Sequence, residues 1–405
     1  MKKLQKLMRM SLLVVLAVSA RTAYSQTGTE VIEMNATSYF SSNYKQARQK
    51  FLDAARIAKA TIESLENPAM RPDAEPLFTD VALIGNKECG TVIVLISGTH
   101  GVEGFFGSAA QTGLLHEGIA SNLPPDTSIL MIHALNPFGF ARVRRFNEDN
   151  IDLNRNFLDH SKPHLKNHEY EKMSKFFAPK SMNILSRIFF WPRLLWYKAT
   201  GQTEAIQQAF SGGQYSYPKG LFYGGTFETW SNLTIRSIVD RYLSDARRVI
   251  IIDFHTGLGT YGDYEMIMQH PEESITYRRA VAIWGSEKVI TTHDAESDPG
   301  EQSDADDLFF AELSGPMKLI FPGLLPNAEV TAVTMEQGAS TSTKVFLALR
   351  EENWLHHYGD STTNNGKRTK AKLLQTFYPD DDEWREMVWL GAKRVVYQAI
   401  ESGSK

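Results

Sequence analysis

Four short apolar runs along the chain predict buried β-strands, and they are Val92–Ile96, Ile129–His133, Val249–Phe254 and Val330–Met335. None of them alternates with polar residues, which is typical of a parallel sheet covered by helices on both faces. Segments with helical periodicity lie between them, at Ser108–Leu115, Thr229–Ser244 and Ile275–Gly285. Strands that alternate with helices predict an α/β fold with a largely parallel central sheet.

Two more segments have a helical pattern, and two others interrupt the alternation. Residues 42–66 repeat apolar positions at three- and four-residue steps, and the C-terminal part from YPDDDEW onward begins with capping Asp residues. In residues 160–225, we interpret the basic, aromatic stretch SRIFFWPRLLWYKATG as a helical insertion and the Gly/Tyr-rich remainder as a loop. Residues 294–307 are acidic and polar, which favours a solvated loop. Neither a repeat nor a linker between two cores is present, so residues 26–405 are predicted to form one domain.

The first 25 residues have the pattern of a secretory signal peptide. Lysines and an arginine precede the apolar run Leu12–Ala20, and the small-x-small site Ala23–Ser25 stands before Gln26. A membrane anchor is the alternative, but the apolar run is too short to span a bilayer. We therefore expect residues 1–25 to be removed and the mature chain, without a transmembrane segment, to be periplasmic or secreted.

Composition excludes several classes of function. Lys and Arg number 43 against 47 Asp and Glu, so no basic excess indicates a nucleic-acid partner. Cys89 is the single cysteine, so an intramolecular disulfide cannot form. The chain has neither a GxSxG nucleophile motif nor a phosphate-binding P-loop, which disfavours a serine hydrolase and a nucleotide-dependent enzyme.

Polar residues capable of chemistry follow each of the four predicted strands. The first is followed by Ser97-Gly98-Thr99-His100-Gly101-Val102-Glu103 and the second, after a loop, by the motif DLNRNF with Asn154 and Arg155. The third strand ends at His255 and the fourth at Glu336. Because ligands of open α/β sheets bind outside the carboxyl ends of the strands, these residues are predicted to form one site.

The residue types at this site fit a catalytic zinc ion. Such an ion takes three protein ligands, two His and one Glu being a known set, and keeps one position for water. His100 and Glu103 are three residues apart, so both can face one metal if the chain turns into a helix there, and His255 is the predicted third ligand. Asp253, two residues before His255 on the same strand face, is expected to orient its imidazole. The sequence thus predicts one zinc per chain.

The remaining polar residues suit an amide hydrolase. Zinc lowers the pKa of its water and polarises a carbonyl, and a carboxylate, here Glu336, must then accept the proton of the attacking water. Arg155 suits a bidentate clamp on a substrate carboxylate. Arg144 or Arg145 suits the stabilisation of a developing oxyanion.

The order of these motifs resembles the zinc carboxypeptidase superfamily. Within it, SGTHGVEGF, NPFGFARVRRFNEDNIDLNRNF, GLFYGG, DFHTGLGTYG and ENWLHHYGD resemble an uncharacterised branch that is catalogued as a domain of unknown function. The resemblance implies a mixed, twisted sheet of about eight strands flanked by helices. It also implies His100, Glu103 and His255 as zinc ligands, Glu336 as the catalytic glutamate, and Arg144 or Arg145 as the carbonyl-polarising residue. Asn154 and Arg155 match the pair that binds the C-terminal carboxylate.

The chain departs from the superfamily in two respects. The tyrosine that closes over substrate cannot be placed, with Tyr261 and Tyr264 as candidates, and the 160–225 insertion has no counterpart in simple carboxypeptidases. We therefore expect a zinc metallopeptidase, namely a metallocarboxypeptidase for peptide or amide substrates with a free carboxylate. The alternatives are a zinc-dependent deacylase of small N-acyl amino acids and a non-catalytic zinc- or peptide-binding protein.

Overall fold

The computed structural model describes residues 35–69, 75–182, 212–292 and 314–403, together with the single positions 192, 196, 199, 200 and 209. By the density of its contacts, the chain from Ala36 to Lys405 forms one compact unit. The predicted signal peptide, the acidic loop 294–307 and all but four positions of the basic, aromatic stretch lie outside the described residues.

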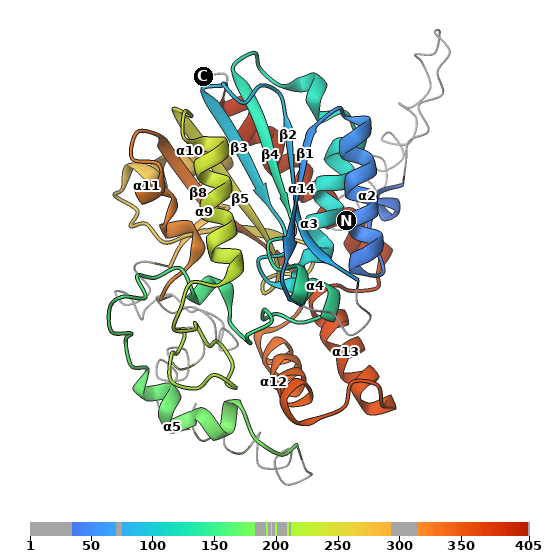
Figure 1. The fold of residues 1–405 in the computed structure, drawn as a ribbon, viewed down its shortest axis with the longest axis vertical. Helices are drawn as coiled ribbons and strands as arrows, with labels where there is room; N and C mark the ends of the chain where they lie inside the picture. Colours follow the sequence, from blue (N-terminus) through green and yellow to red (C-terminus); the bar gives the residue numbers. More distant parts are fainter. Residues whose placement is uncertain are drawn as a thin grey trace, which may run out of the picture. The chain divides into compact units, whose positions relative to one another are not determined.

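An eight-stranded mixed sheet lies at the centre of this unit (Figure 1). Its order is β1-β2-β4-β3-β5-β8-β6-β7, and the middle strands β4, β3, β5 and β8 run parallel. Antiparallel pairings join β1 to β2, β2 to β4 and β6 to β8, while β6 and β7 are parallel. The predicted fold class, a largely parallel mixed sheet of about eight strands flanked by helices, is therefore confirmed. The strands are β1 Thr61–Asn67, β2 Leu77–Ile84, β3 Thr91–Ile96, β4 Thr127–His133, β5 Arg248–Gly257, β6 Tyr264–Met268, β7 Val289–Thr291 and β8 Glu329–Gly338.

Helices cover the sheet on both faces. One face packs against α2 (Tyr44–Ile57), α3 (Gly104–His116), α10 (Ile275–Trp284) and α14 (Asp382–Ser402), and the other against α9 (Trp230–Leu243) and α11 (Phe321–Leu324). In β3, Ile93 and Leu95 enter the first core, whereas Val92, Val94 and Ile96 enter the second. Because successive side chains of a strand point to opposite faces, both sets must be apolar, which explains the uninterrupted apolar runs of the sequence.

The predicted helix over residues 42–66 is wrong in its second half. Helix α2 ends at Ile57, and Lys59 has a positive φ of 57°. Residues Thr61–Asn67 then form the edge strand β1, paired only with β2. An edge strand that is largely exposed carries little periodic signal of its own, so the preceding helical pattern extended over it.

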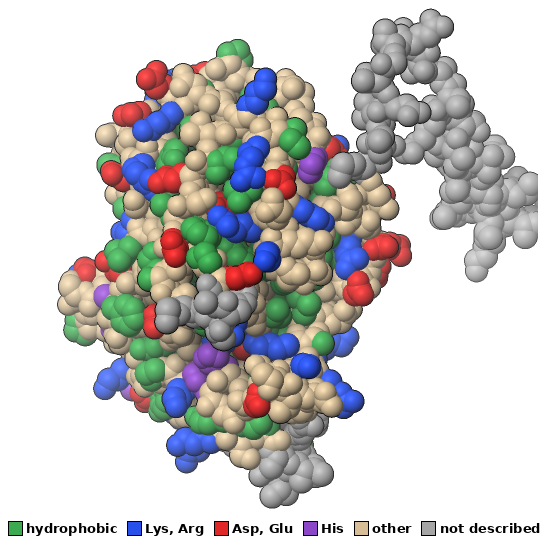
Figure 2. Space-filling model, turned by 45° about the vertical axis from the view of Figure 1, so that its right-hand side comes forward, with side chains coloured by type: hydrophobic (Ala, Val, Ile, Leu, Met, Phe, Trp, Pro, Cys, Tyr) green, Lys and Arg blue, Asp and Glu red, His purple; other side chains and the backbone are tan. Residues whose placement is uncertain are grey.

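Further helices lie beyond the carboxyl ends of the parallel strands (Figure 1). They are α4 (Pro137–Arg142), α5 (His168–Phe177), α12 (Ser342–Tyr358) and α13 (Asn364–Phe377), and a third apolar cluster packs α5, α12 and α13 together. Within the predicted insertion, α5 is helical and the described residues 212–225 are irregular, as expected for a loop rich in Gly and Tyr. Among the residues described, no helix is long and apolar enough to cross a membrane. On the face drawn in Figure 2, Lys and Arg side chains are interspersed with Asp and Glu.

A buried ionic cluster joins α12 and α13 to the loop after α4. The Glu352 carboxylate, fully buried in α12, accepts hydrogen bonds from Arg144 Nε at 2.8 Å and from Lys370 Nζ at 2.6 Å. Burial alone would raise the pKa of Glu352, but the charges of Arg144 and Lys370 outweigh burial and hold that pKa at about 2. Removing one member of such a cluster leaves an uncompensated buried charge.

We predict that Glu352→Gln lowers the free energy of unfolding at pH 7 by about 3 kcal/mol. Since the pKa of Glu352 is lower in the folded state, its contribution is complete above the unfolded pKa, near 4.5, and is lost as the pH falls toward 2. Urea denaturation of wild type and variant at several pH values measures this. The two curves should converge on acidification, and a difference that is constant with pH would contradict the ionic origin.

Candidate metal centre

Three buried side chains converge at the carboxyl ends of β3 and β5. His100 directly precedes the short 3-10 turn η2 (Gly101–Glu103), which leads into α3, so Glu103 follows His100 by one turn. His255 stands near the end of β5, which pairs in parallel with β3. The predicted helical turn at the His100–Glu103 motif is therefore present, and neighbouring parallel strands bring the distant His255 beside it.

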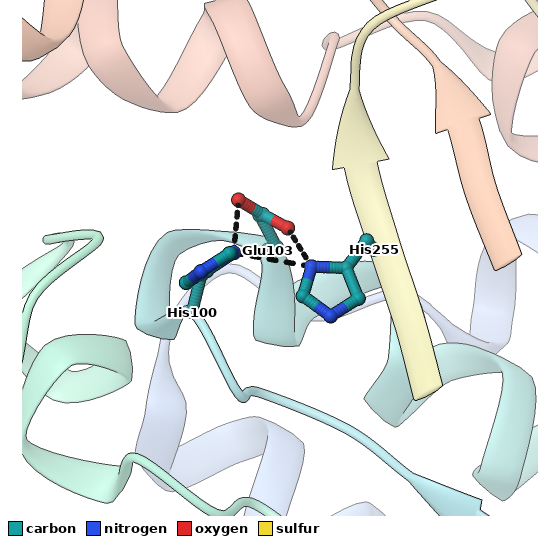
Figure 3. Close-up of side chains that lie close together, drawn as sticks. All are labelled: His100, Glu103 and His255. Atoms are coloured by element: carbon teal, nitrogen blue, oxygen red, sulfur yellow. Dashed lines mark hydrogen bonds and ion pairs between the residues drawn. The ribbon is translucent and has the colours of Figure 1, made fainter. Parts of the chain in front are cut away.

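The donor atoms of these three residues lie within 4.8 Å of one another. His255 Nδ1 is 3.1 Å from His100 Nδ1 and 2.8 Å from Glu103 Oε2, and His100 Nδ1 is 3.0 Å from Glu103 Oε1. Figure 3 shows the two imidazoles and the carboxylate pointing toward one another. In the part of the chain that the structure describes, this is the one group of His, Cys, Asp and Glu donors found close enough together to hold a metal ion.

Two further carboxylates hold the opposite edges of the imidazoles. His100 Nε2 is 3.1 Å from Asp152 Oδ1, and His255 Nε2 is 2.7 Å from Asp253 Oδ2. Asp253 is itself held by the Thr99 hydroxyl, which donates to Oδ1 at 2.7 Å. In the neutral ring, a carboxylate at Nε2 favours the proton there and leaves the Nδ1 lone pair to face the centre, which is the arrangement of metal-binding histidines.

The electrostatics of the site favour a bound cation. Burial would raise the pKa of Glu103, but the neighbouring His100 and His255 hold it far below its usual range. Burial would lower the pKa of His255, yet the charges of Asp253 and Glu103 raise it to about 10. The centre therefore stabilises positive charge between its donors. Two imidazoles and one carboxylate suit zinc, so the residues present fit the predicted ion.

Close backbone packing holds the turn from His100 to Glu103 against α4 and the loop that follows it. A Cβ on Gly101 would lie 2.0 Å from the backbone carbon of Gly139, so no larger residue fits there. Gly101 N donates to the Arg145 carbonyl at 3.2 Å, and Val102 N donates to the Arg144 carbonyl at 2.7 Å. These bonds place the backbone of the two arginines beside the candidate metal ligands.

The adjacent arginines face different surroundings. A cavity opens beside His100, Glu103 and His255, and Arg145 lines it. The Arg145 guanidinium donates to Glu103 Oε1 at 3.0 Å and to Asp152 Oδ2 at 2.9 Å. Arg144 is buried among Glu352 and Asn150 and does not line the cavity. Of the two predicted candidates for stabilising an oxyanion, the structure thus brings Arg145 to the site and not Arg144.

Asn154 and Arg155 line the same cavity and belong to the 3-10 turn η4 (Leu153–Arg155). Asp152 caps the N-terminal end of this turn, because its carboxylate accepts from Asn154 N at 3.0 Å. Residues 212–225 cover Arg155 from outside. The Tyr215 hydroxyl donates to the Arg155 carbonyl at 2.8 Å, and a Cβ on Gly213 would lie 2.7 Å from Arg155 Cδ. The Gly/Tyr-rich loop, whose role the sequence did not reveal, therefore supports a predicted substrate-binding residue.

Glu336 faces the cavity from β8, directly opposite His255 in the β5–β8 register. Its Oε1 accepts from Leu258 N at 2.9 Å. Burial, followed by the charge of Glu103, raises the pKa of Glu336 to about 7, so the side chain can both accept and release a proton near neutral pH. Tyr261 and Tyr264, the candidate capping tyrosines, do not line the cavity; Tyr261 is exposed, with its hydroxyl bonded to Asp381.

Sequence inspection missed Asp152. This carboxylate contacts one imidazole and one guanidinium of the site at once. Its signal was its place at the start of DLNRNF, because an Asp two residues before a cavity-lining Asn and three before an Arg on a short turn lies within reach of both.

We predict that the purified chain binds one zinc ion and that His255→Ala abolishes this binding. Asp253→Asn should weaken zinc affinity by about 10–100-fold, because the His255 ring loses its orienting carboxylate. Competition with a chromogenic chelator measures affinity, and Asp126→Asn, at an exposed ion pair, is the control. Equal zinc content in wild type and His255→Ala would contradict the ligand assignment.

Comparison with solved structures found distant likenesses. Carboxypeptidase A from Helicoverpa armigera matches with 14% identity and a TM-score of 0.43, over 92% of this chain and 80% of that one. Succinylglutamate desuccinylase from Silicibacter sp. TM1040 matches with 13% identity and a TM-score of 0.37, over 74% and 67%. Bovine thrombin-activatable fibrinolysis inhibitor matches with 11% identity and a TM-score of 0.42, over 89% and 98%.

Comparison with curated proteins gave no match. A family model described as "Protein of unknown function (DUF2817)" matches residues 40–390, which include every residue of the site and all eight strands. This agrees with the resemblance to an uncharacterised branch that the motifs indicated. The chain therefore belongs to the DUF2817 family.

Proposed function

We propose that this chain is a zinc-dependent hydrolase of amide bonds that acts as a carboxypeptidase on substrates with a free carboxylate. One observation supports the proposal above all others. The donor trio His100, Glu103 and His255, the carboxylate of Glu336 and the guanidinium of Arg145 line a single cavity at the carboxyl ends of the parallel strands. That is the complement which hydrolysis of an amide requires, namely a Lewis acid site, a base and an oxyanion donor.

Each side chain has a distinct part in this proposal. A zinc ion, when bound by the trio, polarises the scissile carbonyl and acidifies a water molecule. Glu336 takes a proton from the attacking water and passes it to the leaving nitrogen. Arg145 donates to the developing oxyanion; it has five N–H donors, of which the bonds to Glu103 and Asp152 occupy only part.

Arg155, with Asn154, binds the free carboxylate and so selects the C-terminal residue. Arg155 is buried at the cavity wall, where a guanidinium is screened little by water and pairs strongly with a carboxylate. The Tyr215 and Gly213 contacts hold it in place before substrate arrives. A fixed guanidinium loses little conformational entropy on binding.

Glu336→Gln should lower kcat by about 10²–10⁴-fold while zinc content stays at one per chain, because the amide cannot accept a proton. The measurement combines metal analysis with mass spectrometry of a digested peptide library. Glu265→Gln is the matched control, since Glu265 is the cross-strand partner of Glu336 on β6 and lines the same cavity. Full turnover by Glu336→Gln would refute the assignment of the base.

Arg155→Met should raise KM for peptides with a free C-terminus by about tenfold or more and leave the slow hydrolysis of C-terminally amidated peptides unchanged, since only the former lose a charge-assisted pair. Thermal unfolding verifies that the variant folds. Wild-type enzyme that cleaves free and amidated peptides equally well would argue against a carboxypeptidase.

The alternative, a deacylase of N-acyl amino acids, uses the same chemistry and differs in what lies on the acyl side of the bond. Assays with N-acetyl amino acids beside N-acetyl dipeptides distinguish the two. A non-catalytic binding protein would hold zinc and ligand without turnover.

We further propose that the enzyme is exported and works in the periplasm or outside the cell, on the basis of the signal-like residues 1–25.

A further inference from the structure

A buried lysine lines the cavity beyond the metal centre. Lys318 belongs to the 3-10 turn η5 (Met317–Leu319), between the segment ending at Pro316 and α11, and its residue surface is 8% exposed. Lysines are almost never buried to this degree unless they are paired. We therefore ask which group compensates the charge of Lys318 in the cavity wall.

Among the described residues, the ammonium of Lys318 is bonded only to neutral oxygens. Nζ donates to the Ile267 carbonyl at 2.9 Å and to the Thr334 hydroxyl at 3.2 Å. Over the described ranges of the chain, no carboxylate oxygen forms an ion pair with Lys318 within 4.0 Å. Since an ammonium has three N–H donors, one donor and the full charge remain for a group inside the cavity.

Strand register places this ammonium deeper than the catalytic groups. Glu265 and Glu336 are cross-strand partners on the antiparallel strands β6 and β8, and Ile267 and Thr334 are the partners two residues away, toward the C-terminus of β6 and the N-terminus of β8. Two residues of a strand span about 7 Å. The cavity thus has two levels along these strands. The carboxylate of Glu336 lies at the first, and the ammonium of Lys318, bonded to Ile267 and Thr334, lies at the second.

The other charged groups near this second level are already engaged or lie beside it. Asp253 pairs with Thr334 in the β5–β8 register, but its carboxylate accepts from Thr99 and holds His255. Met317 N donates to Asn154 Oδ1 at 3.2 Å, so the Lys318 turn adjoins the Asn154–Arg155 pair. Two cationic side chains, Arg155 and Lys318, therefore line one end of the cavity from adjacent segments.

We propose that Lys318 is a specificity-determining residue that receives a second carboxylate, so that the preferred substrates are amides whose C-terminal residue is itself acidic. In this arrangement Arg155 binds the main-chain carboxylate and Lys318 binds the side-chain carboxylate of an aspartate or glutamate. The inference rests on the proposed function and names its substrate class.

The cost of burying Lys318 agrees with such an occupant. Burial lowers the pKa of Lys318 to about 8, with only the more distant Asp253 and Glu336 acting against it. A substrate carboxylate at hydrogen-bond distance offsets this burial, which a neutral side chain of the same shape does not. Discrimination should therefore be strongest between isosteric acidic and neutral residues.

The test compares zinc-loaded full-length chain on acetyl-Ala-Glu and acetyl-Ala-Gln, which differ only in the charged group. We expect kcat/KM to favour the glutamate peptide by about tenfold or more in wild type, as for loss of one charge-assisted hydrogen bond. Lys318→Met should remove the preference, through KM for the glutamate peptide. Lys344→Met, an exposed lysine next to the cavity-lining Val345, matches the change in net charge and should leave the preference intact.

Binding of the same two peptides to Glu336→Gln, with and without Lys318→Met, gives a readout that does not depend on turnover. If Glu336→Gln binds the glutamate peptide more tightly and Lys318→Met abolishes this preference, the inference is supported, even when the wild-type chain cleaves neither peptide. Absence of cleavage by the wild type would overturn the proposed function alone. Cleavage of both peptides with equal kcat/KM, or an equal loss for both in Lys318→Met, assigns Lys318 a structural role and overturns the inference. Failure of Glu336→Gln to bind either peptide overturns it as well.

Discussion

The site depends on the way in which two carboxylates fix two imidazoles. Asp152 holds Nε2 of His100 and Asp253 holds Nε2 of His255, so both rings present Nδ1 to the Glu103 carboxylate. Without these partners each ring could rotate or change tautomer, and the three donors would not share a focus. The geometry thus originates in residues that lie behind the donors, and the parallel β3–β5 pairing sets the distance between them.

The same carboxylates connect the candidate metal ligands to the residues that would contact substrate. Asp152 also accepts from Arg145 and caps the turn that carries Asn154 and Arg155. Arg145 in turn donates to Glu103. These residues thus share one network of buried, charge-assisted hydrogen bonds, which are stronger in such surroundings than in water.

Much of this arrangement could be predicted from the sequence, and the exceptions have physical causes. The four central strands were recognisable because a strand covered on both faces needs apolar residues throughout. The convergence of His100, Glu103 and His255 was predictable because parallel strands end at one edge of the sheet. The edge strand β1 was predicted as helix because a strand at the edge of the sheet does not need apolar residues throughout. Which of Arg144 and Arg145 faces the cavity depends on the direction in which the backbone points each side chain, and the residue types alone do not reveal this direction.

The far end of the cavity includes one segment, the Lys318 turn, that contributes no residue to the candidate metal centre. His100 lies between β3 and η2, Glu103 ends η2 and His255 lies in β5, whereas the Lys318 turn lies between β7 and β8 and is bonded to β6. We expect a substitution at Lys318 to change the charge at this end of the cavity while the three candidate metal ligands, which Lys318 does not contact, stay in place. Under the proposed function, the choice of substrate can therefore change at Lys318 without any change in the residues that would hold zinc.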